Sequence, residues 1–377
     1  MSHDTYVCHS CGAGFPLESL AFRCSCGGLL DIAPFEPHFP PSSKFSGEHS
    51  VFRYAEAMPD FAGKSALWRS SWQQVSMGEG LSGLVPLDPQ YPEVLVKLDY
   101  AMPTLSFKDR GAAVLVSAAL VAGARRLIQD SSGNAGASVA AYATRAGLAC
   151  DIYVPSSTSP RKIAQIEAYG ARAMLVDGSR EDTAHAALTA AIEGLAFYAS
   201  HVYNPFFYQG TKTYVYELYE SLGGRLPDTL YLPLGNGTLV LGAHYALKDL
   251  KALGLISRWP RIVAVQAAGC APVFKAYERG QPDVVAVDNT GTEAEGIAIA
   301  APLRGTQVLE AIRELGGEVI LAPEAGIVDA KKAVAARGFF IETTSAATFA
   351  AFFERKAGGL EEGLVVLPLC GSGLKSV

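Results

Sequence analysis

The chain has 377 residues, of which 49% are apolar and 18% are charged, and this is typical of a folded protein with two or three domains. Its 31 basic and 37 acidic residues give a net charge of −6, and no lysine- or arginine-rich block provides the surface that a nucleic acid needs. The longest nearly uncharged run, residues 111–124, is shorter than the roughly 18 residues of a membrane span. We therefore expect neither a nucleic acid nor a membrane as a partner.

The N-terminal residues, MSHDTYVCHSCG, lack the basic and then apolar order of a signal peptide. Four of the seven cysteines lie close together near this end: Cys8, Cys11, Cys24 and Cys26. An odd number of cysteines, with four in two close pairs, favours a reducing compartment and metal ligation over disulfides, so we expect a cytoplasmic protein. The spacing predicts a zinc-ribbon-like module over residues 1–32 with a structural Zn²⁺. The alternative is a metal-free knuckle, because the second pair is C-x-C.

Residues 34–49, PFEPHFPPSSKFSGEH, predict a linker or an irregular segment. After residue 94, short apolar runs alternate with helical patterns. Strands are predicted at 95–98, 127–130, 151–154, 173–176, 229–234, 261–266, 318–322 and 364–369. Helices are predicted after Ser106, from Asn134, and at 159–170, 181–194, 237–250, 270–280 and 324–338. This alternation predicts an α/β fold with parallel sheets, which bind ligands at the carboxyl ends of their strands.

The stretch PTLSFKDRGA, residues 103–112, places a lysine at the beginning of an apolar helix. Ser106 and Asp109 fit the S-x-x-D capping pattern, which predicts a helix that begins at Ser106 and has Lys108 in its first turn. The positive end of a helix and partial burial both favour a neutral amine, and a neutral lysine amine is a nucleophile. Taken alone, the motif also fits a surface lysine in a charge cluster.

Two further turns combine small residues with the start of a helix. The N–H groups and the side chains of Ser131, Ser132 and Asn134 in SSGNAGAS suit a carboxylate, although a tightly packed turn fits equally well. In GNGTLVLG, Gly235 and Gly237 allow a group of N–H donors suited to a phosphate. The turn fits the dinucleotide-binding pattern G-x-G-x-x-G poorly, because the next glycine, at position 242, lies too far along the chain.

These motifs, followed by IETTSAA and the closing LCGSGLKS, occur in the order found in one enzyme family. The sequence resembles the threonine synthase-like branch of the fold-type II, tryptophan synthase β-like, pyridoxal-phosphate enzymes over almost its whole length. The resemblance implies two doubly wound domains of parallel or mixed sheets with the cofactor between them. The large domain would comprise residues 33–100 and 211–377, and the small domain residues 101–210. Relatives are often dimers, so a homodimer is compatible with the resemblance.

The resemblance also implies a role for individual residues. The cofactor would contact Phe107, Lys108, Asn134, Gly235, Asn236, Gly237, Thr238 and Cys370. Lys108 would bind pyridoxal phosphate covalently and later transfer protons on the substrate. Asn134 would hydrogen-bond the phenolic oxygen, and the glycine turn would hold the phosphate. Cys370 would place a neutral group at the pyridine nitrogen, which in this family accompanies elimination and replacement rather than transamination.

The expected partner is a small-molecule substrate, an amino acid. Its binding residues would be Ser131, Ser132, Gly133, Asn134, Ala135, Lys162 and Phe207. Lys162 matches a phosphate-contacting lysine of the family, whereas Phe207 stands near the place of an expected basic residue, which removes a charge-assisted contact. Ala135 replaces the usual threonine, and EGLSGLVPL replaces the family's E-G-x-T-P-L.

The predicted function is elimination or replacement at Cβ or Cγ of an amino acid with a hydroxy- or phospho-type leaving group. One alternative is a true threonine synthase, which converts O-phosphohomoserine to threonine and phosphate. The other is a non-catalytic nucleotide- or phosphate-binding protein, whose glycine turns hold a phosphate without covalent chemistry.

Overall fold

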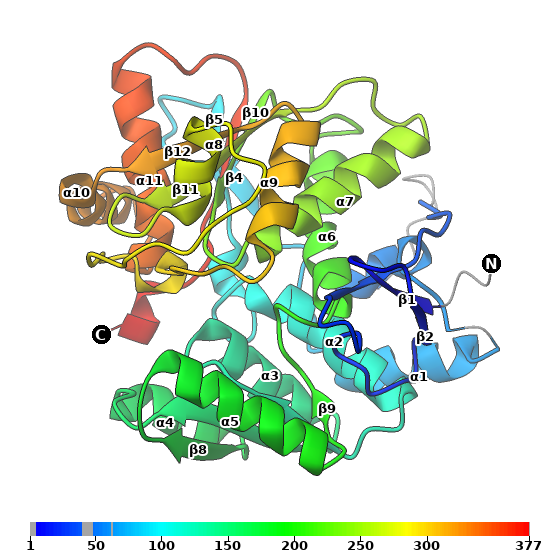
Figure 1. Cartoon of the computed structure of the whole chain (residues 1–377). Helices are drawn as coiled ribbons and strands as arrows, with labels where there is room; N and C mark the ends of the chain where they lie inside the picture. The colour runs from blue at the N-terminus through cyan, green and yellow to red at the C-terminus, as the bar shows by residue number, and fades with distance from the viewer. Residues whose placement is uncertain (1–4, 40–47, 62, 377) are drawn as a thin grey trace. The chain divides into compact units, whose positions relative to one another are not determined.

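The computed structural model describes residues 5–39, 48–61 and 63–376 (Figure 1). Part of the predicted linker, residues 40–47, lies outside the described residues. Contacts between residues in the folded structure divide the chain into two compact units. Unit 1 comprises Met1–Gly80 and Lys108–Gly210, and unit 2 comprises Leu81–Phe107 and Thr211–Val377. Residues 33–80 thus belong to unit 1 by their contacts, whereas the sequence-based boundaries group residues 33–100 with the large domain.

Unit 1 contains a small antiparallel sheet, a parallel sheet and the helices around it. Its strands are β1 (Thr5–Cys8), β2 (Gly14–Pro16), β3 (Leu30–Ile32), β6 (Arg126–Gln129), β7 (Ala149–Pro155), β8 (Arg172–Val176) and β9 (Phe197–Tyr198). Its helices are η2 (Val51–Ala57), α1 (Ser65–Val75), α2 (Lys108–Val121), α3 (Asn134–Arg145), α4 (Pro160–Ala168) and α5 (Arg180–Glu193). Helix α6 (Phe206–Ser221) begins in unit 1 and continues into unit 2.

The main sheet of unit 1 has the order β8-β7-β6-β9, with every pair parallel. The chain runs from β6 outward to β7 and β8 and then returns to the other side of β6 as β9. Such a reversal creates a switch point, where the loops after two neighbouring strands leave a crevice for a ligand. In unit 1 the switch point lies between the carboxyl ends of β6 and β9.

Unit 2 contains a six-stranded mixed sheet. Its strands are β4 (Leu84–Pro86), β5 (Val94–Lys97), β10 (Thr229–Pro233), β11 (Arg261–Ala267), β12 (Glu318–Ala322) and β13 (Val365–Pro368). Its helices are η3 (Asp99–Ala101), α7 (Thr238–Ala252), α8 (Pro272–Glu278), η4 (Glu295–Ile297), α9 (Gly305–Glu314), α10 (Glu324–Ala335), α11 (Thr343–Ala357) and η5 (Gly373–Ser376).

The sheet of unit 2 has the order β12-β11-β10-β13-β5-β4, and only the edge strand β4 pairs antiparallel. Strands β10 and β13 are parallel neighbours, so the segments that follow them begin at the same edge of the sheet. Strands β10 and β13 are nearly continuous apolar runs, because their side chains are buried on both faces of the sheet. Helices α10 and α11 pack side by side, as Figure 1 shows.

The predicted alternation of strands and helices is confirmed, but one helix start is wrong. Helix α2 begins at Lys108 and not at Ser106. The backbone of Ser106 pairs with Gly371 instead, and its buried hydroxyl has no hydrogen-bond partner among the described residues. The S-x-x-D pattern therefore does not form a capping box here, because strand-like pairing holds Ser106 in extended backbone. Among the described residues, no helix is long and apolar enough to cross a membrane.

Candidate active site

In unit 1, Lys108 is the first residue of α2, as the first-turn prediction required. The rest of this helix is almost completely buried, which explains why its sequence is apolar on all sides. The next residue, Asp109, is also buried, and its Oδ1 accepts a hydrogen bond from the hydroxyl of Ser138 on α3. The backbone that carries Lys108 is therefore fixed to α3, the helix that begins with the predicted carboxylate-binding turn.

The side chain of Lys108 lies beside an aromatic ring. Its Nζ is 5.7 Å from the centroid of the Phe207 ring. Phe207 is completely buried and packs on the backbone of Gly111, where an added Cβ would lie 2.5 Å from the ring. Gly111 is one helical turn after Lys108, so both residues are on the same face of α2. Unit 1 thus brings together two predicted site residues, Lys108 and Phe207.

The predicted carboxylate-binding turn follows β6 at the switch point of unit 1. Helix α3 begins at Asn134, and the N–H of Ala137 bonds to the carbonyl oxygen of Gly133 at 3.1 Å. A helix leaves the N–H groups of its first turn without partners inside the helix. Gly136 is required here, because a Cβ would lie 1.8 Å from the carbonyl oxygen of Ser131. The turn has the shape and the donors that suit a carboxylate.

Lys162 lies on α4, which follows β7, the neighbour of β6. Its side chain is partly buried. Because the carboxyl ends of parallel strands share one edge, the helix that carries Lys162 begins at the same edge of the unit 1 sheet as the turn after β6.

In unit 2, the glycine turn after β10 is shaped by close packing. Gly237 has a φ of +76°, and a Cβ on it would lie 2.3 Å from Val308 of α9. A Cβ on Gly235 would lie 2.9 Å from Cα of Ile297. Only glycine fits both positions, and Thr238 then begins α7. The N–H donors of the first turn of α7 suit a phosphate, which supports the predicted use of this loop.

Cys370 follows β13, the parallel neighbour of β10, and its side chain is buried. Its backbone N–H donates to the hydroxyl of Ser345 at 3.1 Å, and its carbonyl accepts from the N–H of Phe107 at 2.8 Å. Cys370, Phe107 and the glycine turn are therefore held at one edge of the unit 2 sheet. Phe107 is the residue immediately before Lys108 in the chain.

Sequence reasoning assigns no role to three buried ionisable groups of unit 1. Asp130, at the end of β6, accepts a bond from Arg180 of α5 at 2.9 Å. His201 follows β9 and is buried. Glu79 accepts bonds from Tyr142 at 3.0 Å and from the N–H of Met77 at 2.8 Å, and burial raises its pKa to about 7. A two-residue strand such as β9 shows no alternating pattern, so the sequence offers no signal for His201.

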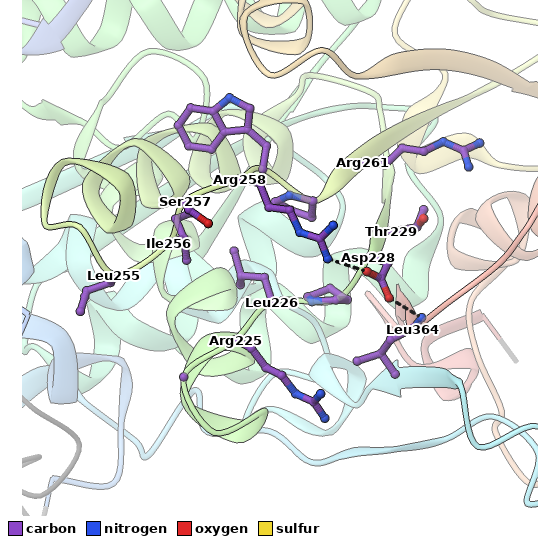
Figure 2. A pocket seen from close by; sticks show the side chains of 14 residues that line it. Arg225, Leu226, Asp228, Thr229, Leu255, Ile256, Ser257, Arg258, Arg261 and Leu364 are labelled. Atoms are coloured by element: carbon purple, nitrogen blue, oxygen red, sulfur yellow. Dashed lines mark hydrogen bonds and ion pairs between the residues drawn. The ribbon is translucent and has the colours of Figure 1, made fainter.

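A pocket of about 600 Å³ opens at the other edge of the unit 2 sheet, at the amino ends of β10 and β11 (Figure 2). Arg225, Arg258 and Arg261 line it, and Arg258 pairs with Asp228, which also accepts from the N–H of Leu364. Because the glycine turn follows the carboxyl end of β10, this pocket is distinct from the predicted cofactor site.

The four N-terminal cysteines converge in unit 1. Their sulfur atoms all lie within 4.8 Å of one another, and three of the Sγ–Sγ distances are 3.5 to 3.6 Å. Four thiolates around a tetrahedral Zn²⁺ are about 3.8 Å apart, given Zn–S bonds of about 2.3 Å. Gly28 is needed beside them, because a Cβ there would lie 2.6 Å from Sγ of Cys8. The donor set therefore fits a tetrahedral zinc ion.

Comparisons with known proteins agree on the family. Residues 75–371 match the family model described as pyridoxal-phosphate dependent enzyme. The chain is 30% identical to a threonine synthase of Methanocaldococcus jannaschii over 98% of this chain and 92% of the relative. It is 34% identical to a threonine synthase of Mycobacterium leprae over 81% and 84%, and 36% identical to one of Synechocystis over 75% and 72%.

Solved structures agree on the fold. A maize serine racemase superposes with a TM-score of 0.68 at 20% identity, covering 82% of this chain and 93% of that one. The processed form of a threonine deaminase of Solanum lycopersicum superposes with a TM-score of 0.66 at 21% identity, covering 82% and 85%. Together with the matches in sequence, these findings mean that the chain belongs to the pyridoxal-phosphate-dependent enzymes, as a lyase or synthase of the threonine synthase family.

Proposed function

We propose that the chain binds one pyridoxal phosphate. The glycine turn of unit 2, with Gly235, Asn236, Gly237 and Thr238, would bind its phosphate, and Cys370 would face the pyridine nitrogen. Lys108 of unit 1 would bind the aldehyde carbon covalently, with Asn134 at the phenolic oxygen and Phe107 beside the ring. The fit rests on the close packing around Gly235 and Gly237, which only glycine allows, and on the start of α7 at Thr238, since the N-terminus of a helix suits a phosphate. When bound, the cofactor supplies an electron sink for cleavage of bonds at Cα and beyond.

The protein residues would then bind the substrate and move its protons. The turn that contains Ser131, Ser132 and Ala135 would bind the α-carboxylate through the N–H groups of α3. The amine of Lys108 would take the proton from Cα and return it later. Cys370 would leave the pyridine nitrogen without a carboxylate partner, and this favours elimination and replacement.

The identity of the substrate depends on its leaving group. The proposal for this group rests on the position of Phe207. Its ring is completely buried beside Lys108 and offers no charge to a phosphate. A phosphate dianion without a paired cation in such a site loses charge-assisted bonds of about 1.5 to 3 kcal/mol each. We infer that the leaving group is an uncharged hydroxyl type, which is eliminated or is replaced by water or a second nucleophile at Cβ or Cγ.

The test is product formation by the purified holoenzyme. L-Serine and L-threonine should give pyruvate and 2-oxobutyrate if elimination of a hydroxyl is the reaction, and a set of nucleophiles added to the same mixtures would reveal replacement. Phosphate release from O-phosphohomoserine is measured in parallel. Rapid phosphate release with no turnover of either hydroxy amino acid would reject this substrate class.

That outcome would support the second candidate, a true threonine synthase. Two observations favour it: the relatives named threonine synthase match most of the chain, and the helix of Lys162 begins at the edge of the unit 1 sheet where the substrate turn lies. Lys162 would then supply part of the charge that Phe207 does not. A Lys162→Met variant separates the candidates, because it should raise KM for O-phosphohomoserine strongly and KM for L-serine little.

Covalent cofactor binding is tested independently of the substrate. The purified protein should absorb visible light after incubation with pyridoxal phosphate, and borohydride should fix the cofactor to the chain. Lys108→Ala should abolish the fixation. A protein that stays colourless would instead support a non-catalytic phosphate-binding role.

We also propose that Cys8, Cys11, Cys24 and Cys26 bind one structural Zn²⁺. The support is the convergence of the four sulfur atoms within 4.8 Å of one another, with three separations of 3.5 to 3.6 Å that are close to those of a tetrahedral thiolate site. The site lies next to the small sheet β1–β3, whose Tyr6 packs edge-on against Phe206 at the start of α6. Elemental analysis should find one zinc per chain, and Cys11→Ser should reduce it. A zinc-free protein with unchanged thermal stability after chelator treatment would contradict the proposal.

A further inference from the structure

His201 lies next to the predicted substrate turn, although no sequence motif contains it. Strands β6 and β9 pair in parallel, with Ile128 opposite Tyr198. Ser131 and His201 are each three residues beyond this pair, on neighbouring chain segments at the carboxyl edge of the sheet. Parallel neighbouring strands are about 4.8 Å apart. His201 therefore flanks the switch point of unit 1 from the side opposite Ser131.

Several hydrogen bonds connect the segment that carries His201 to itself and to the start of α6. Asn204 N–H donates to Ser200 O at 3.0 Å, and Val202 N–H donates to the hydroxyl of Ser200 at 3.3 Å. The side chain of Asn204 accepts from the N–H of Phe206 at 3.0 Å, which fixes the start of α6. Tyr208 donates its hydroxyl hydrogen to Val202 O at 2.7 Å. These bonds hold His201 and the first turn of α6 in one geometry, as a binding site requires.

His201 and Lys108 both lie beside the ring of Phe207. The imidazole centroid is 5.8 Å from the Phe207 centroid, and Nζ of Lys108 is 5.7 Å from it. Burial, followed by the positive charges of Lys108 and Arg180, holds the pKa of His201 well below its usual value. The imidazole is therefore neutral at physiological pH, and a neutral imidazole has one N–H donor and one nitrogen acceptor.

We propose that His201 hydrogen-bonds the side-chain hydroxyl of the amino-acid substrate and thereby selects hydroxy amino acids. The inference rests on the function proposed above and names the residue that determines its specificity. A hydroxyl both donates and accepts, so it matches an imidazole, whereas a phosphate requires a cation that neither His201 nor Phe207 provides. Lys108 would act at Cα of the same substrate, and because both Lys108 and His201 lie beside the Phe207 ring, the side chain of that substrate would be within reach of His201.

The experiment compares binding of matched pairs that differ only by the hydroxyl group: L-serine with L-alanine, and L-threonine with L-2-aminobutyrate. Dissociation constants come from the change in cofactor absorbance of the holoenzyme within the mixing time, before turnover. The wild-type protein should prefer the hydroxyl ligand of at least one pair by about tenfold. His201→Phe should reduce that preference to about one, whereas His201→Gln, which keeps a donor and an acceptor, should retain part of it.

Two controls separate a contact from a structural role. His185→Phe, the same change at an exposed position of α5, should leave the preference unchanged. If His201→Phe fails to fold, the partial retention expected of His201→Gln still tests the inference. An unchanged preference in a folded His201→Phe holoenzyme overturns the inference and leaves the proposed function standing. If the wild-type holoenzyme responds to none of the four amino acids, the proposed function fails and the inference fails with it.

Discussion

At the scale of single residues, the proposed leaving group depends on Phe207. The Phe207→Arg variant would place a guanidinium beside Lys108, in the position where the family pattern predicts a basic, phosphate-binding residue. A bidentate arginine–phosphate contact is worth about 1.5 to 3 kcal/mol, so KM for O-phosphohomoserine should fall about tenfold or more relative to wild type. Steady-state kinetics of phosphate release measures this change.

The matched control for that change is Phe207→Leu, which removes the ring without adding charge and should not improve KM for the phosphorylated substrate. Both variants alter the packing on Gly111, so thermal unfolding of each is recorded as well. Equal KM values for the two variants would show that Phe207 does not face the leaving group.

The buried carboxyl group of Glu79 makes the stability of unit 1 decrease as the pH rises. Burial raises its pKa from 4.5 to about 7 in the folded protein, so between these pH values the unfolded chain releases a proton that the folded chain keeps. Stability is therefore greatest below the lower value and falls as pH rises toward 7, by about 3 kcal/mol in total for this group. Glu79→Gln should remove this loss, because glutamine stays neutral and still accepts from Met77 N–H.

The measurement is the free energy of unfolding in urea at pH 5 and pH 8 for wild type and Glu79→Gln. The variant should gain clearly more stability relative to wild type at pH 8 than at pH 5, because only a small part of the loss has developed at pH 5. If the difference between the two proteins is the same at both pH values, Glu79 does not titrate in this window.

At the scale of elements, α6 and α7 together fix the glycine turn. The hydroxyl of Thr211 on α6 donates to Thr238 O at 3.0 Å, at the first residue of α7. A Cβ on Gly242 would lie 2.3 Å from that hydroxyl oxygen and 2.8 Å from the Thr211 backbone. The Gly242→Ala variant should therefore move α7 away from α6 and weaken cofactor binding by about tenfold, although alanine is the better helix former.

The control is Gly326→Ala in α10, where the nearest atom to an added Cβ is 3.3 Å away on the ring of Pro323. This variant should keep wild-type affinity for pyridoxal phosphate, measured by absorbance titration. Equal affinities for the two variants would mean that the packing of α6 on α7 does not position the turn.

Other strands and helices show where prediction from the sequence succeeds and where it fails. Strands β10 and β13 are predictable because they are buried on both faces and are continuous apolar runs. The alternating pattern does not single out α9 and α11, since neither follows directly on a recognised strand. The capping pattern at Ser106 fails because pairing with Gly371, far along the chain, overrides the local preference for a helix cap. Local patterns do not report pairing between distant segments.

At the scale of the whole molecule, the sequence offers candidate site residues where a motif is contiguous, as at Lys108 and Gly235, and their roles stay predictions. His201 and Glu79 cannot be found in this way, because their surroundings come from segments far apart in the chain. His201 contacts Phe207, and the charges of Lys108 and Arg180 help to lower its pKa, whereas Glu79 binds Tyr142 of α3. Their environments exist only once unit 1 has folded.

Covalent binding of pyridoxal phosphate has a thermodynamic consequence for the whole molecule. A ligand that binds only the folded protein stabilises it by about 2.7 kcal/mol at a hundredfold excess over its dissociation constant. Calorimetry should therefore show unfolding of the holoenzyme at a higher temperature than unfolding of the cofactor-free protein. Lys108→Ala with added pyridoxal phosphate, which lacks the covalent attachment, should unfold at a temperature between these two. If Lys108→Ala with pyridoxal phosphate unfolds at the same temperature as the wild-type holoenzyme, the proposed covalent link to Lys108 is wrong.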